Sequence, residues 1–135
     1  MKNATFFKYQ GTGNDFVMID NRTEFFPKKN VKLIEKLCDR RFGIGGDGLI
    51  LLENDLAADF KMVYYNADGN ESTMCGNGGR CIVSFAHFLE IFSKDTTFNA
   101  IDGLHHATID QNGIVALQMI DVAKDTIKKD TDFMF

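Results

Sequence analysis

Short apolar segments bounded by turn-forming residues alternate along this chain with two longer segments of helical period. The helical segments are Val31–Arg41 and Gly76–Phe92, and in the second the apolar residues cover most of the circumference, which predicts a helix buried on nearly all sides. The short segments predict seven β-strands, at Thr5–Tyr9, Phe16–Asp20, Leu49–Glu53, Phe60–Tyr65, Thr96–Ala100, His105–Ile109 and Ile114–Met119. The pattern therefore predicts an α+β fold, with a strand-rich mixed sheet or open barrel wrapping one buried central helix.

Turn signals separate the last three strands. Ile101-Asp102-Gly103 and Gln111-Asn112-Gly113 both predict hairpin turns, and Asn-Gly is the strongest short hairpin signal. The final stretch, Asp121–Phe135, has no comparable pattern, and it ends in the apolar residues Phe133-Met134-Phe135, which no predicted element covers. We expect this stretch to be loose and to contact a partner chain.

Composition narrows the class of protein. A chain of 135 residues with 44% hydrophobic content suits one compact domain with a sizeable core. The 19 acidic and 15 basic residues give a net charge of −4, without the basic surplus of a nucleic-acid-binding protein. No signal sequence and no apolar stretch of membrane-spanning length is visible, so we expect a cytoplasmic protein that does not contact membranes. Three irregularly spaced cysteines argue against a disulfide framework.

The most informative chemistry is a cysteine in a glycine-rich turn. Cys75 stands immediately before the second predicted helix and is followed by Gly76, Gly78 and Gly79. The unpaired N–H groups of a helix start favour an anion, and glycines let a ligand approach the backbone. The same field lowers the pKa of a thiol. This turn could therefore supply a base together with a cradle for the charge formed when a proton leaves a carbon next to a carboxylate.

Other interpretations of these cysteines and glycines are weaker. A cysteine before a helix is often inert core, but the polar neighbours of Cys75 make a poor core environment, whereas Cys81 and Cys38 lie on apolar stripes typical of packing. The turn lacks the lysine of a phosphate-binding loop and the paired ligands of a zinc site. Gly43–Gly48 fits GxGxxG, but a helix precedes it and a strand follows, so we expect helix termination there, with Gly43 as a left-handed cap.

The three histidines do not suggest a catalytic base. His87 falls within the second predicted helix, and His105 and His106 belong to a hairpin far from every glycine-rich motif. We therefore expect structural roles for all three.

Three ordered motifs resemble those of the diaminopimelate epimerase family. Lys8–Phe16 is similar to the family's N-terminal signature, Arg41–Gly48 to its second, and Asn66–Arg80 to its active-site signature. The family inverts an amino-acid α-carbon without pyridoxal phosphate or any other cofactor, and its fold is built from two domains that contribute one cysteine each. The resemblance implies that residues 1–120 form the N-terminal domain, and that residues 121–135 are a linker-like tail toward a missing second domain.

The resemblance also implies roles for single residues. Cys75 would be the catalytic thiol on one face of the substrate's α-carbon. Asn14 and Asn66 would contact the bound amino acid, and Gly76 and Asn77 would offer backbone N–H groups to the reacting carboxylate. Some family members carry glutamine where this chain has Gly48, which can offer only its backbone, so this contact is carried over weakly. No metal is implied.

The function implied is interconversion of LL- and meso-diaminopimelate, for lysine and cell-wall synthesis, with the missing C-terminal half as a partner and a homodimer as a possible assembly. Two alternatives stay open. The short chain could be a noncatalytic ligand-binding or assembly module, since half a site cannot complete an inversion. A proline or hydroxyproline epimerase relative is the other, although those enzymes commonly carry histidine where this chain has Asn77.

Overall fold

The computed structural model describes residues 5–73 and 76–119, so Cys75 and the stretch from residue 120 onward lie outside the described residues. All seven predicted strands and both predicted helices are present in this part of the chain. The strands are β1 (Phe7–Gly11), β2 (Asn14–Asp20), β3 (Gly48–Glu53), β4 (Phe60–Asn66), β5 (Asp95–Ala100), β6 (Gly103–Ile109) and β7 (Val115–Met119). The helices are α1 (Val31–Cys38), between β2 and β3, and α2 (Gly76–Phe88), between β4 and β5.

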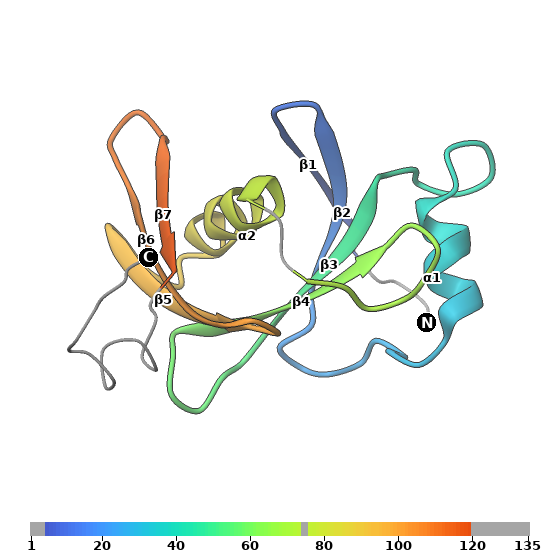
Figure 1. Cartoon of the computed structure of the whole chain (residues 1–135), viewed down its shortest axis with the longest axis horizontal. Helices are drawn as coiled ribbons and strands as arrows, with labels where there is room; N and C mark the ends of the chain where they lie inside the picture. The colour runs from blue at the N-terminus through green and yellow to red at the C-terminus, as the bar shows by residue number, and fades with distance from the viewer. Residues whose placement is uncertain (1–4, 74–75, 120–135) are drawn as a thin grey trace, which may run out of the picture.

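The strands form one mixed sheet in the order of the sequence, from β1 to β7. Each pair is antiparallel except β2 with β3 and β4 with β5, which are parallel and are the two pairs joined through a helix. The sheet curves around α2, so that β1 and β2 lie on one side of this helix and β6 and β7 on the other (Figure 1). The prediction of an open barrel around a central helix is therefore confirmed.

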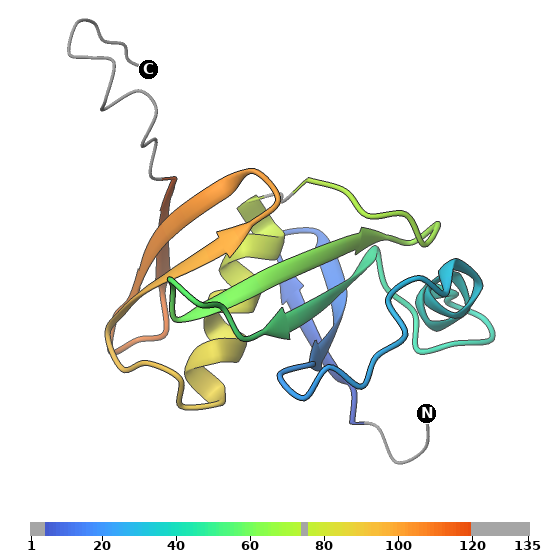
Figure 2. The ribbon, with the colours of Figure 1, turned by 90° about the horizontal axis from the view of Figure 1, so that it is seen from below.

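The two helices cover opposite faces of the sheet. Since β3 and β4 are antiparallel, the strands of the β2–β3 pair run opposite to those of the β4–β5 pair. Both crossovers add the next strand on the same side of the sheet. Two right-handed crossovers of this kind place their helices on opposite faces. Figure 2 shows α2 crossing behind β3 and β4, with α1 well separated from it. The sheet is therefore apolar on both faces around β2, β3 and β4.

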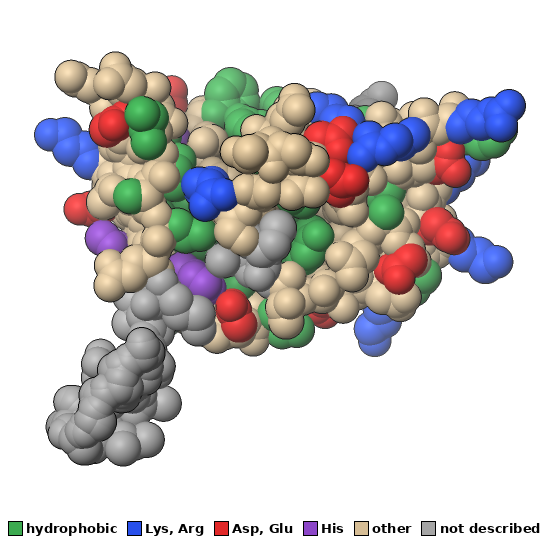
Figure 3. Space-filling model, turned by 45° about the horizontal axis from the view of Figure 1, so that its top comes forward, with side chains coloured by type: hydrophobic (Ala, Val, Ile, Leu, Met, Phe, Trp, Pro, Cys, Tyr) green, Lys and Arg blue, Asp and Glu red, His purple; other side chains and the backbone are tan. Residues whose placement is uncertain are grey.

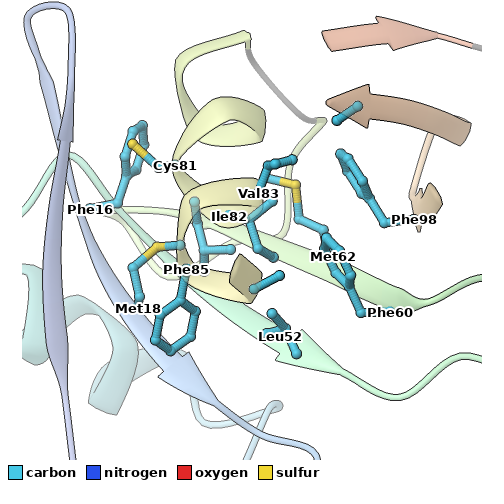
Figure 4. Packing of buried hydrophobic residues seen from close by; sticks show 13 residues of the cluster. Phe16, Met18, Leu52, Phe60, Met62, Cys81, Ile82, Val83, Phe85 and Phe98 are labelled. Atoms are coloured by element: carbon cyan, nitrogen blue, oxygen red, sulfur yellow. The ribbon is translucent and has the colours of Figure 1, made fainter. Parts of the chain in front are cut away.

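Two buried clusters follow from this arrangement. On the α2 face, helix residues pack against alternate strand residues that include Phe16, Met18, Ile50 and Leu52 (Figure 4). The intervening residues of the same strands, such as Val17 and Leu49, point to the other face and pack with α1. The strict alternation in β2 and β3 is the period of two expected of an extended chain.

Helix α1 ends at Cys38, three residues before the predicted end, because the chain folds back over its last turn. The N–H groups of Ile44 and Gly45 donate to the carbonyl oxygen of Leu37, both at 3.0 Å. The prediction that Gly43 is a left-handed cap is wrong, since the positive φ, 88°, belongs to Gly45. Gly43 is needed for close approach instead, because an added Cβ would lie 1.9 Å from the carbonyl oxygen of Lys36.

Helix α2 ends at Phe88, four residues before the predicted end. Glu90 has a φ of 63°, the Glu90 N–H donates to the His87 carbonyl, and the Ile91 N–H donates to the Ala86 carbonyl. This is the Schellman arrangement, with glutamate in the position that usually holds glycine. The expectation of a helix buried on nearly all sides holds for its sheet-facing residues, but Arg80, His87 and Phe88 are exposed.

Among the described residues, neither helix has the length and hydrophobicity needed to cross a membrane.

Candidate functional site

Four segments that carry predicted site residues meet at one end of α2. Asn14 begins β2 opposite Gly11, Gly48 begins β3 beside Phe16, and Asn66 ends β4 directly opposite Gly48. Helix α2 begins at Gly76, the next residue after Cys75 in the sequence. The sheet register therefore brings segments more than fifty residues apart to the same edge.

Asn77 ties the first turn of α2 to the turn between β1 and β2. Its Nδ2 donates to Oδ1 of Asn14 at 2.7 Å and to the carbonyl oxygen of Thr12 at 3.1 Å. Gly11 permits this approach, because an added Cβ would lie only 3.0 Å from the Cβ of Asn77. Two predicted substrate-binding residues, Asn14 and Asn77, are thus in direct contact.

Asp47 holds Asn14 from the other side. Oδ2 of Asp47 accepts from Nδ2 of Asn14 and from the backbone N–H of Asp15, both at 3.1 Å. The Asp47 N–H donates in return to the carbonyl oxygen of Asp15 at 2.8 Å. The start of β2 is therefore bound reciprocally to the loop that precedes β3.

A cluster of charges surrounds this contact. Arg40 donates two hydrogen bonds to Asp15, at 2.8 and 3.0 Å, and one to Asp47 at 3.0 Å, and Lys8 pairs with Asp15 at 3.0 Å. Figure 3 shows acidic and basic side chains lying directly against one another on this face. The hydrogen bonds from Arg40, followed by those from Lys8, hold the pKa of Asp15 well below its usual range even though partial burial opposes them.

The first turn of α2 has open space on the side that a ligand would need. Gly76 is exposed, and an added Cβ would meet only the Arg80 guanidinium, at 3.4 Å, among the described residues. Arg80 also donates to Oδ1 of Asn77. A guanidinium therefore lies beside the positive end of the helix, and both favour an anion there.

An open pocket of about 460 Å³ adjoins this end of the helix. It lies between the β1 and β7 ends of the sheet and is bordered by Thr12, Arg80 and Val115. Arg80 is thus accessible from this side.

Gly48 has a steric role in the sheet. It is buried, and an added Cβ would lie 2.7 Å from both the ring of Tyr64 and the carbonyl oxygen of Tyr65. This close packing explains glycine at the position without reference to a ligand, and the substrate contact suggested for Gly48 stays a prediction.

Asn66 is exposed at the end of β4, next to a tight turn. Its backbone N–H donates to the Asn70 carbonyl at 3.0 Å, and its carbonyl accepts from Gly69 at 2.9 Å. The Asn66 carboxamide has no hydrogen-bond partner within the part of the chain that the structure describes, and its contact with a substrate stays a prediction.

The other two cysteines are packing residues, as expected. Cys38 and Cys81 are buried at 3% and 4% exposure, Cys38 at the end of α1 in the cluster that contains Val17, and Cys81 in the cluster that contains Phe16 (Figure 4). Burial raises the pKa of the Cys38 thiol to about 11, which keeps it protonated at neutral pH. Cys75 lies outside the described residues, so its role as the reactive thiol stays a prediction.

Two of the histidines, His105 and His87, pack against aromatic rings. His105 is buried in β6, where its ring stacks on Phe98 and its Nε2 lies 2.9 Å from Oδ1 of Asp102. His87 lies near the opposite end of α2 and is exposed, with its ring against Phe92. The contacts of His105 fit the structural role expected of it.

Sequence reasoning did not assign roles to Asp47, Arg40 or Arg80. Asp47 and Arg80 stand inside the second and third motifs, but nothing in their spacing says which side chain they face. A charged residue between glycines, as in Gly46-Asp47-Gly48, was the available signal for Asp47. Within the described residues, no group of three or more His, Cys, Asp or Glu side chains could hold a metal ion.

Comparisons with known proteins agree with the fold and the motifs. The diaminopimelate epimerase of Flavobacterium psychrophilum is 67% identical over 128 residues, which is 95% of this chain and 50% of the relative. That of Chlorobaculum tepidum is 47% identical over 112 residues, covering 82% of this chain and 43% of the relative. The chain thus spans about half the length of these curated relatives.

Solved structures with low sequence identity share the fold. A PhzF-family phenazine biosynthesis protein from Bacillus anthracis superposes with a TM-score of 0.64 at 18% identity, over 87% of this chain and 40% of its own. A probable proline racemase from Agrobacterium radiobacter gives a TM-score of 0.57 at 13% identity, over 85% and 41%. The family model for diaminopimelate epimerase matches residues 6–125, and the chain therefore belongs to the diaminopimelate epimerase family.

Proposed function

We propose that this chain is one half of a cofactor-independent epimerase that interconverts LL- and meso-diaminopimelate in the cytoplasm, as a step toward lysine and cell-wall precursors. The observation that carries the proposal is the hydrogen bond between Asn14 and Asn77. It joins two residues of separate family motifs at the first turn of α2, directly after Cys75 in the sequence.

The chemistry follows from this geometry. The reacting carboxylate docks at the backbone N–H groups of Gly76 and Asn77, where the helix dipole and the Arg80 guanidinium stabilise negative charge. The thiolate of Cys75 takes the α-proton, and the electron pair of the broken C–H bond is delocalised into the carboxylate. A thiol on the opposite face then delivers a proton to the carbon, which inverts its configuration.

The second thiol comes from outside this chain in our proposal. Cys38 and Cys81 are both buried, and Cys81 lies within α2 itself, so neither can reach the opposite face of a substrate held at the helix start. The curated relatives are about twice as long as the matched segment, which supports a second half that carries the other acid. Asn66, exposed at the end of β4, is our candidate for the distal amino and carboxylate groups of the substrate.

A chimera tests this function. Residues 6–119 of this chain would replace the matching segment of the Flavobacterium psychrophilum relative, and the product would be assayed for conversion of LL- to meso-diaminopimelate. We expect turnover by the chimera and a loss of about 10³-fold or more in Cys75→Ser, the loss typical when an acid–base group is removed. Cys81→Ser is the matched control and should retain turnover. An inactive, folded chimera, or equal turnover by Cys75→Ser, would contradict the proposal.

Solvent exchange separates the epimerase from a noncatalytic ligand-binding or assembly module. In D₂O, the chimera should introduce deuterium at the α-carbon of diaminopimelate in step with inversion. Binding of diaminopimelate by the chimera without any exchange would favour the noncatalytic module instead.

A further inference from the structure

A line of side-chain hydrogen bonds runs through the candidate site from Asp47 to Arg80. Asn14 donates to Asp47, Asn77 donates to Asn14, and Arg80 donates to Asn77. The line connects the loop before β3, the start of β2 and the first turn of α2.

The two ends of this line fix the orientation of both carboxamides. An ionised carboxylate only accepts hydrogen bonds and a guanidinium only donates them, whereas an amide can present either its oxygen or its nitrogen. Nδ2 of Asn14 must therefore face Asp47, and Oδ1 of Asn14 must face Asn77. If the Asn14 amide were flipped, its oxygen would meet a carboxylate oxygen at 3.1 Å and its nitrogen would meet the Nδ2 of Asn77 at 2.7 Å.

This orientation decides what Asn14 can offer to a ligand. Its oxygen already accepts from Asn77 and one of its two N–H groups is bound to Asp47. The other N–H has no partner in the described residues, and the rest of the site fixes its direction. An unflipped Asn14 thus presents a donor to a substrate oxygen.

We propose that Asp47 is a positioning residue that orients the Asn14 carboxamide toward the substrate. This inference rests on the proposed function, in which Asn14 contacts diaminopimelate. Asp47 is itself held in place by Arg40, through its other carboxylate oxygen, and by the backbone N–H of Asp15. Its backbone bond to Asp15 does not depend on the side chain, so the loop keeps that anchor in an Asp47→Ala variant.

Three variants separate positioning from stability. Asp47→Ala removes the acceptor that faces Asn14. Asp47→Asn keeps an oxygen toward Asn14 and turns its amide nitrogen toward Arg40, which retains both bonds to Asp15. Asp15→Ala is the matched control, because it breaks more of the charge cluster than Asp47→Ala does and leaves the Asn14–Asp47 bond intact.

The kinetic test uses the active chimera. We expect Asp47→Ala to raise KM about tenfold with kcat within about threefold, as for the loss of one oriented hydrogen bond made equally in the ground and transition states. The KM of Asp47→Asn should stay within about threefold of the parent value. Asp15→Ala should lower the Tm at least as much as Asp47→Ala does, while the KM of Asp15→Ala stays within about twofold of the parent value. Equal KM in Asp47→Ala and the parent, or an equal rise in all three variants, would overturn the inference.

A second readout does not depend on turnover. In the 135-residue chain, the side-chain amide proton of Asn14 that faces Asp47 should give a downfield ¹H–¹⁵N NMR signal. The signal should shift upfield in Asp47→Ala and remain in Asp15→Ala. An unchanged Asn14 signal in Asp47→Ala would refute the positioning role, whereas an inactive parent chimera with the expected NMR shift would refute the proposed function and leave the orientation by Asp47 supported.

Discussion

At the scale of single residues, both of the cysteines that the structure describes are buried. Cys38 is buried with its thiol pKa raised to about 11, and Cys81 is buried among aromatic and aliphatic side chains. Cys75 directly precedes the exposed start of α2, where the helix dipole and Arg80 favour a thiolate.

We therefore expect Cys75 to be alkylated by iodoacetamide well before Cys38 and Cys81. The pH midpoint of its alkylation rate should lie below ~8.5, the pKa of a free thiol. Mass-spectrometric mapping of limited labelling between pH 5 and pH 10 measures this. Preferential labelling of Cys38 would mean that the reactive thiol has been assigned to the wrong residue.

Asp15 gives a prediction about pH. Its folded pKa is depressed below the ordinary value of 3.8, chiefly by the hydrogen bonds from Arg40. A carboxylate of lowered pKa stabilises the fold above its unfolded pKa, and this contribution is lost as the pH falls through the window below about 4. Asp15→Asn should therefore be less stable than the parent at pH 7, and the difference should be smaller at pH 3, where the loss of this contribution has begun. Urea unfolding at both values checks this, and a difference that is constant with pH would contradict it.

The residue scale also shows what the sequence could and could not reveal about the site. Asn14 and Asn77 were identified because they stand in recognisable motifs, and they are in contact. Asp47 and Arg80 stand in the same motifs, but their importance comes from the partners that they face, which depend on the sheet register and on the start of α2. A single sequence contains no direct record of those contacts.

At the scale of elements, hydrophobic periodicity located every strand and helix of the described chain, but it placed several ends wrongly. The apolar pattern of α2 continues to Phe92, but the helix itself ends at Phe88 because Glu90 adopts a left-handed conformation. Glutamate rarely takes that position, so the residue types in this segment did not predict the end of the helix. In the same way, β2 starts at Asn14 although its first two residues are polar, because they pair with the end of β1.

The end of α1 depends on the missing side chain of Gly43. A methyl group there would lie 1.9 Å from one backbone carbonyl oxygen and 2.9 Å from the next, so the loop over Cys38 would have to move. We expect Gly43→Ala to lower the free energy of unfolding by about 2 kcal/mol or more, as for an overpacked core site. Gly13→Ala is a control with no crowding, which carries only the strain of its φ of 79°. A loss in chemical denaturation that is no larger for Gly43→Ala than for Gly13→Ala would contradict the role of crowding at Gly43.

The start of α2 can be tested separately from the thiol. Since the space beside Gly76 is bounded only by Arg80 among the described residues, Gly76→Val should change stability by less than about 1 kcal/mol, the range of helix propensities. A branched side chain there would nevertheless crowd a carboxylate docked on the helix, so the KM of the chimera for diaminopimelate should rise about tenfold or more.

Cys75→Ser is the complementary variant, because it should preserve binding of diaminopimelate while removing proton transfer. Calorimetric titration and turnover measurements distinguish the two effects. Equal binding and turnover by Gly76→Val and the parent would place the anion cradle elsewhere.

At the scale of the whole molecule, the sheet order could not be taken from periodicity, since each strand pattern is compatible with several neighbours. The observed order brings the two asparagines, the charge cluster and the start of α2 to one edge. In our proposal the chain nevertheless provides only one face of the site, since both of its described cysteines are buried.

The central claim is that this chain supplies one of two acid–base faces, and inversion of diaminopimelate measures it most directly. LL-diaminopimelate would be incubated with the 135-residue chain alone, with a separately produced second half of the Flavobacterium psychrophilum relative alone, and with both together. We expect no appreciable meso product from either part and measurable inversion from the mixture, lost when the chain carries Cys75→Ser. Robust inversion by the 135-residue chain alone would contradict the division of the active site that we propose.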